Sequence, residues 1–206
     1  MKEGLKFIFG DKRLRGLVII IMAINLTIGT VGIFLVYLVE VQFRLSAIYY
    51  TTLALCVTLG AIAGSIAGSK VRGKVGHYSI GTIFPIAMLL LAIGNLNTIY
   101  PDYAALIGVG ILVGIVNVVV NTAVMKIVDQ EMMARVSGTL NTFGVSITFV
   151  SGAIGGALIG LLTLRGAFIL ISIILGAVSF IPLLFRDFFN LKVEGEIDAA
   201  GTESNA

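Results

Sequence analysis

Uncharged polar residues recur inside long apolar stretches of this sequence, and these residues could carry specific chemistry. Asn25 and Thr30 lie in the first stretch, and Asn117 and Asn121 lie four residues apart in a later one, on one face of a helix. An amide or hydroxyl in such surroundings needs a hydrogen-bond partner or water, because leaving it unpaired is costly. These side chains therefore either join neighbouring helices or line a polar cavity for a solute, and the sequence leaves both interpretations open.

A similar polar stripe follows on the next apolar stretch. Ser137, Asn141, Gly144 and Thr148 are spaced so that they share one side of a helix. Enzyme signatures are missing: the sequence contains no HExxH, no GxSxG, no Walker lysine loop and no paired cysteines. We therefore expect no catalytic residue, no metal site and no cofactor.

The composition indicates what must position these polar residues. The chain is 58% hydrophobic and 12% charged, with a mean hydropathy of +1.07. Soluble domains carry about 25% charged residues, so a surface with so few charges must largely face lipid. The basic residues lie in short loops between apolar stretches rather than on a stripe, and this placement argues against nucleic acid as a partner.

Six stretches are long enough to cross a bilayer core, which requires about 20 residues of helix. We predict an all-α membrane protein with a cytoplasmic amino-terminal segment at residues 1–15, a six-helix transmembrane domain at 16–185 and a disordered cytoplasmic tail at 186–206. The predicted spans are 16–39, 46–69, 79–96, 103–128, 136–164 and 166–185.

The distribution of lysine and arginine predicts the orientation. Of the 14 basic residues, only Arg44 and Arg165 fall in the loops on one side of the predicted membrane. All the others fall at the two termini or in the loops on the opposite side. Because cytoplasmic loops carry an excess of lysine and arginine, we expect a multi-pass protein of the cell membrane with both termini in the cytoplasm.

Two glycine stripes occupy matching positions in the order of the spans. Gly60, Gly64 and Gly68 lie in the second span, and Gly152, Gly156 and Gly160 lie in the fifth. Small residues at this spacing let helices approach closely. The second and fifth spans would be equivalent if spans 1–3 and 4–6 were inverted repeats, which are typical of secondary transporters. We therefore predict two inverted three-helix repeats.

Several motifs, in order along the chain, are similar to the carboxy-terminal half of major facilitator superfamily transporters of the bacterial and archaeal efflux type. Residues 11–15 and the following span with Asn25 resemble the linker and seventh helix of that subgroup. Residues 60–74 resemble a degenerate copy of the glycine-and-basic loop motif, without its acid. Residues 108–121 resemble the tenth helix, and residues 129–138 resemble the loop that enters the eleventh.

The resemblance covers about residues 10–190 and implies half of a major facilitator fold, in which the first and fourth spans line a central cavity. The resemblance makes four uncharged polar residues of these two spans the candidates for the substrate cavity: Asn25, Thr30, Asn117 and Asn121. It assigns both glycine stripes to packing against the other half: Gly60, Gly64, Gly68, Gly152, Gly156 and Gly160. It places four basic residues in cytoplasmic loops or a gate: Lys70, Arg72, Lys74 and Arg135.

The resemblance also implies partners and a function. Half of the expected transporter is missing, so we expect a second six-helix half, from a separate chain or a second copy, besides membrane lipid and a small-molecule solute. The leading interpretation is transport, in the export direction, of a small lipophilic or amphipathic solute by alternating access, since the cavity lining is uncharged. The alternatives are a non-transporting assembly or regulatory subunit, an inactive transporter fragment, or an intramembrane enzyme of an unfamiliar kind.

Overall fold

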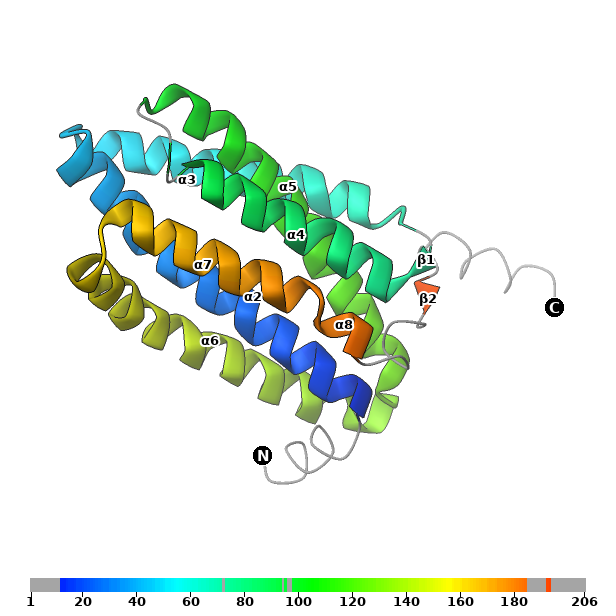
Figure 1. Cartoon of the computed structure of the whole chain (residues 1–206). Coiled ribbons are helices and arrows are strands. Elements are labelled where there is room, and N and C mark those ends of the chain that lie inside the picture. Colours follow the sequence, from blue (N-terminus) through cyan, green and yellow to red (C-terminus); the bar gives the residue numbers. More distant parts are fainter. Residues whose placement is uncertain (1–11, 72, 94, 96–97, 185–191, 194–206) are drawn as a thin grey trace.

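The computed structural model describes residues 12–71, 73–93, 95, 98–184 and 192–193 of the chain, and it is almost entirely helical (Figure 1). The long helices are α2 (Lys12–Tyr37), α3 (Ala47–Gly68), α4 (Val75–Ile93), α5 (Tyr100–Ile127), α6 (Gln130–Leu161) and α7 (Leu164–Ser179). The short elements are the π-helix η1 (Leu38–Gln42), the helix α8 (Ile181–Leu184) and the strands β1 (Gly73–Lys74) and β2 (Lys192–Val193). The prediction of six long helices is confirmed.

Five of the described helices are long and apolar enough to cross a membrane: α2 with its η1 extension, α3, α4, α5 and α6. The sixth predicted span, 166–185, is not one continuous helix. Instead, α7 has 16 residues and is followed after Phe180 by the four-residue α8. The Phe180 amide bonds to the carbonyl of Ala177, a tight last turn, and Pro182 then lacks the N–H that an uninterrupted helix would use.

The long helices run up and down along one common direction, so that alternate connections gather at opposite ends (Figure 1). The first turn of α2, the α3–α4 and α5–α6 connections and α8 lie at one end, which we call the basic end. Its described basic residues are Lys12, Arg13, Arg15, Lys70, Lys74, Lys126, Arg135 and Lys192. The opposite end carries Arg44 and Arg165, so the predicted separation of the basic residues is present in the fold.

Helices α3 and α5 make the most extensive helix–helix contact among the described elements, and glycine makes their close approach possible. A Cβ built on Gly64 would overlap the carbonyl oxygen of Ile111, and one built on Gly68 would lie 3.1 Å from the Cα of Ile115. Gly60 faces the same helix, at Ile107. The stripe of Gly60, Gly64 and Gly68 is therefore buried within this chain, which does not match the expected role in packing against another half.

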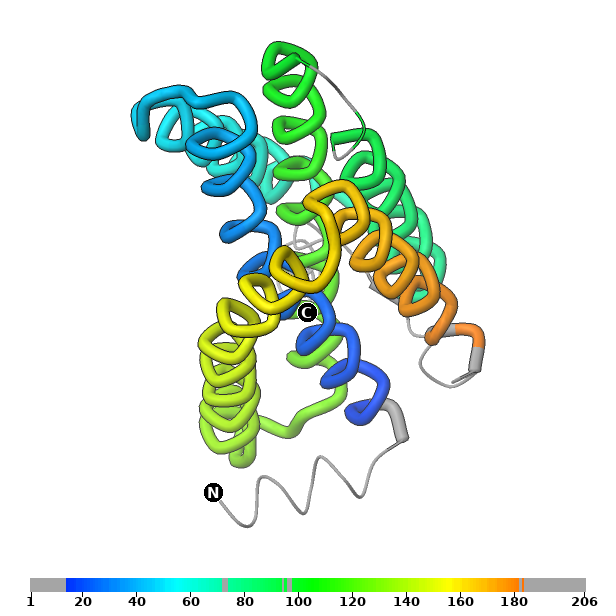
Figure 2. Tube along the Cα trace, turned by 60° about the vertical axis from the view of Figure 1, so that its left-hand side comes forward, coloured from blue at the N-terminus to red at the C-terminus, as the bar shows by residue number. Residues whose placement is uncertain are grey.

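The second glycine stripe lies on an open surface. Helix α6 packs on α2, while α4 contacts both α5 and α7 (Figure 1, Figure 2). A Cβ built on Gly152, Gly156 or Gly160 would meet no atom within 4 Å. The glycines of α6 that do face α2 are Gly144 and Gly155. The predicted stripe thus points away from the contact that α6 makes in this chain.

A short antiparallel ladder joins the end of the chain to the α3–α4 connection. Gly73 pairs with Val193 and Lys74 with Lys192. Two residues of the predicted disordered tail therefore form a strand, and the remaining tail residues lie outside the described part of the chain. Arg72, one of the predicted loop or gate residues, also lies outside it.

Candidate functional site

Helices α2, α5 and α6 form a partly open polar cavity of about 320 Å³, to which three of the four predicted cavity residues belong. Asn25 comes from α2, and Asn117 and Asn121 come from α5. The polar cavity is lined by Ile21, Asn25, Asn117, Val120, Asn121, Val124, Ser137, Leu140, Asn141, Gly144, Val145 and Thr148. The polar stripe of α6, which the sequence analysis noted but left out of the site, supplies the third wall.

Helical spacing brings these side chains together. Asn117 and Asn121 lie one turn apart on α5, and Asn141 lies three residues before Gly144 on the facing side of α6. Gly144 faces α2, since a Cβ there would sit 3.4 Å from the Nδ2 of Asn25, an ordinary van der Waals contact. The result is a cluster of amides at the half of the bundle nearer the basic end.

The hydrogen bonds of these asparagines bear on their two interpretations. The Asn25 Nδ2 donates to the carbonyl of Ile21 at 2.8 Å, within its own helix. Among the described residues, no hydrogen bond is made by the side chains of Asn117, Asn121 and Asn141, which are exposed to the cavity. These amides do not join helices, so their donors and acceptors remain available to water or a solute.

Thr30, the fourth predicted cavity residue, is not part of the polar cavity. It is fully buried between α2 and α6, and its hydroxyl donates to the carbonyl of Ser151 at 3.4 Å. The neighbouring Gly29 allows this approach, because a Cβ there would overlap the Ser151 Oγ. Thr30 is a packing residue, and it lies about one and a half turns beyond Asn25 on α2.

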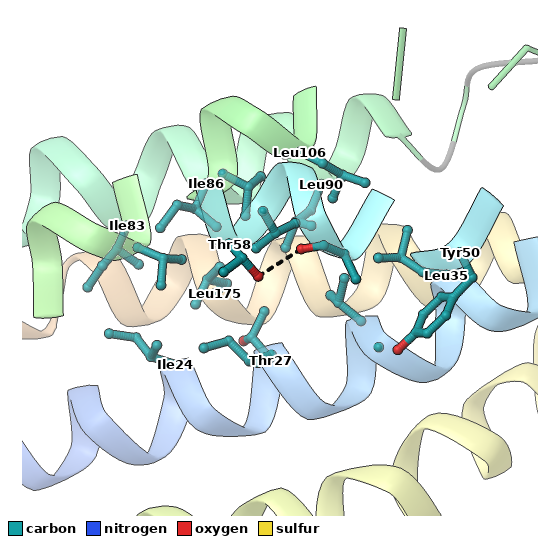
Figure 3. A pocket seen from close by; sticks show the side chains of 17 residues that line it. Ile24, Thr27, Leu35, Tyr50, Thr58, Ile83, Ile86, Leu90, Leu106 and Leu175 are labelled. Atoms are coloured by element: carbon teal, nitrogen blue, oxygen red, sulfur yellow. Dashed lines mark hydrogen bonds between the residues drawn. The ribbon is translucent and has the colours of Figure 1, made fainter. Parts of the chain in front are cut away.

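A second cavity, also of about 320 Å³, lies in the other half of the bundle and is apolar (Figure 3). It is lined by Ile24, Thr27, Ile28, Val31, Gly32, Leu35, Tyr50, Ala54, Val57, Thr58, Ile83, Ile86, Leu90, Leu106, Val109, Val113 and Leu175. Its two threonine hydroxyls are used inside their own helices, because Thr27 donates to Ala23 at 2.8 Å and Thr58 donates to Ala54 at 2.9 Å. No sequence signal distinguishes these aliphatic residues from an ordinary apolar helix surface.

Asp102 is a buried acid that the sequence analysis missed. The fourth span was predicted to begin at residue 103, whereas α5 begins at Tyr100 and places Asp102 in its first turn. The side chain is fully buried, and within the part of the chain that the structure describes neither carboxylate oxygen has a hydrogen-bond partner. It lies at the end opposite the basic one, outside both cavities.

The other predicted site residues lie apart from the cavities. Lys70 and Lys74 are exposed around the α3–α4 connection, and Arg135 is exposed near the start of α6. The described residues contain no group of three or more histidine, cysteine, aspartate or glutamate side chains placed to hold a metal ion. The polar cavity itself offers hydrogen bonding by neutral amides beside apolar surface.

Comparison with known proteins agrees with this picture at a coarse level. No family model matches the chain. Over 146 residues it is 25% identical to an uncharacterized MFS-type transporter, YkuC, from Bacillus subtilis (strain 168). The match covers 69% of this chain and 34% of the relative, so the chain spans about a third of the relative's length. Together with the long apolar helices, this distant similarity indicates a multi-pass membrane protein related to transporters.

Proposed function

We propose that this chain is one half of a secondary transporter that exports a small lipophilic or amphipathic solute by alternating access. The observation that carries the proposal is the polar cavity, in which the amides of Asn117, Asn121 and Asn141 have no protein partner among the described residues. Free amides inside a membrane bundle are costly unless they meet water or a ligand. Similarity to an MFS-type transporter supports the same function.

The packing of the helices supports an inverted-repeat architecture. In two three-helix repeats, α2 corresponds to α5, α3 to α6 and α4 to α7. The repeat symmetry then requires that a contact between α3 and α5 be matched by one between α6 and α2. Both contacts occur and both involve glycine. In such transporters the solute lies at the interface between repeats, as the polar cavity does between α2 and α5–α6.

The proposal includes a second six-helix half, from a separate chain or a second copy, and both termini in the cytoplasm. A cysteine placed at Lys70, in a Cys56→Ser background, should react with a membrane-impermeant maleimide only in opened cells, and one at Arg44 should react in intact cells. The reverse pattern would contradict this orientation.

The test of transport replaces the free amides. Asn117→Ala with Asn121→Ala removes two hydrogen-bonding groups, each worth about 1 kcal/mol, so we expect export of an uncharged lipophilic dye to fall about tenfold or more. Thr142→Ala is the matched control, because Thr142 is exposed on α6 but does not line the cavity. The amount of protein in the membrane is measured alongside.

The two leading functions predict different results. Lost export with an unchanged amount of protein supports a solute cavity. Lost protein alone indicates that the asparagines serve assembly, as a non-transporting subunit would require. Unchanged export with unchanged protein would contradict the transport site.

A further inference from the structure

The two cavities share α2 and α5 as walls, and along α5 they lie one after the other. On α5, Val113 lines the apolar cavity, and Asn117, one turn later and about 6 Å along the helix, lines the polar one. On α2 the two cavities meet side by side, because Asn25 lines the polar cavity while Ile24 and Ile28 line the apolar one. Because Val113 and Asn117 share a face of α5, the two cavities form the polar and the apolar segment of one trough along this helix.

The two segments differ in what they can bind. The polar segment offers the unpartnered amides of Asn117 and Asn121. In the apolar segment the hydroxyls of Thr27 and Thr58 donate within their own helices, so the surface is mostly aliphatic, with the Tyr50 ring beside it (Figure 3). None of the described residues that line either segment carries a charge.

We propose that the solute of this trough is a single-tailed amphiphile whose uncharged, hydrogen-bonding head lies among the asparagines of the polar cavity and whose alkyl tail extends into the apolar cavity. The proposal rests on the proposed function and names its substrate class and orientation. An uncharged head fits because the lining offers donors and acceptors without a counter-ion. An alkyl tail fits because each methylene moved from water into an apolar site strengthens binding about fourfold.

The experiment uses two photoactivatable isomers of n-decyl glucoside, one with a diazirine at the end of the tail and one with a diazirine beside the sugar. Each is added, below its micelle concentration, to the full chain in phospholipid nanodiscs, and the labelled peptides are identified by mass spectrometry. The tail-end isomer should label α3 and the first half of α5. The sugar-side isomer should label α6 and the second half of α5, and excess unlabelled decyl glucoside should suppress both.

A pair of glycine variants tests the tail segment. Gly32 lines the apolar cavity and Gly81 does not, yet a Cβ on either would meet no atom within 4 Å, so both sites accept a larger side chain. Gly32→Leu should weaken decyl glucoside binding about tenfold or more, since excluding two methylenes costs about fourfold each. Gly81→Leu should leave binding unchanged. Equal effects of the two variants would overturn the tail site.

Adjacent residues of α6 test the head segment. Asn141 lines the polar cavity, whereas Thr142 is exposed beside it and does not. Asn141→Leu should weaken binding several-fold and remove the sugar-side label from α6, while Thr142→Leu should change neither. Retention of that label in Asn141→Leu would overturn the head site.

Two further outcomes separate this inference from the proposed function. The inference fails, even where dye export persists, if both isomers label the same peptides. It also fails if decyl glucoside does not suppress the tail-end label, because a phospholipid chain then occupies the apolar cavity alone. If the two isomers label as expected but the asparagine variants export dye normally, the amphiphile site stands and the proposed transport site fails.

Discussion

The two glycine stripes have the same spacing in sequence and opposite surroundings in the structure. Gly60, Gly64 and Gly68 of α3 are buried against the backbone of α5. On α6, a Cβ at Gly152, Gly156 or Gly160 would meet no atom within 4 Å. A repeat of small residues therefore indicates that a helix can approach a neighbour closely. It does not indicate which helix that neighbour is, or whether it belongs to the same chain.

The largest expected effect comes from Gly64→Ala. The new Cβ would overlap the carbonyl oxygen of Ile111, a backbone atom that can move only if the two helices separate. We expect the free energy of unfolding to fall by about 2–3 kcal/mol, the upper part of the range for overpacking. Unfolding in mixed micelles measures it, with Gly152→Ala as the matched control. Equal stability of the two variants would contradict the tight α3–α5 contact.

A smaller effect is expected at the end of the same stripe. In Gly68→Ala the new Cβ would lie 3.1 Å from the Ile115 Cα and 3.2 Å from the Val118 Cβ, so shifts of a few tenths of an ångström relieve the contact. We expect the free energy of unfolding to fall by about 1 kcal/mol, the lower end of the range for overpacking. A loss as large as that of Gly64→Ala would show that the helices cannot adjust near the basic end.

The smallest effect on the chain's own stability is expected from Gly156→Ile on α6. The new side chain enters open space, so the free energy of unfolding should change by no more than about 0.5 kcal/mol. If this stripe packs against a second six-helix half, the same variant should reduce association in the membrane, measured by cross-linking or energy transfer. Unchanged association would show that the stripe is not part of the surface between the two halves. Strong destabilisation would contradict the finding that these glycines face open space.

Much of the local structure could be predicted from the sequence. Long apolar stretches must form helices in a membrane because every backbone group needs an internal partner, and all six long helices are present. Their boundaries were less certain: α5 begins three residues earlier than predicted and takes Asp102 into its buried first turn. The prediction of the last span as one continuous helix was wrong, because the helix is interrupted at Phe180, between α7 and α8.

The candidate site was predictable in part. Asn25, Asn117 and Asn121 stood out because amides are rare and costly in apolar stretches, and they line one cavity. Thr30 was selected by the same argument, but a hydroxyl can bond to a neighbouring carbonyl, and it does so with Ser151. The apolar cavity gave no signal, since aliphatic residues look alike whether they face lipid, core or an empty space.

By itself, the sequence determined the helices, their alternating direction, the gathering of basic residues at one end and the presence of polar groups inside the bundle. These follow from hydropathy, charge and helical spacing, which are properties of each segment alone. Tertiary structure decided which glycines were buried, that Thr30 packs while Asn117 and Asn121 have no partner among the described residues, and that the polar and apolar cavities adjoin at α2 and α5. Those outcomes depend on which faces of distant helices meet, and no single segment encodes its neighbour.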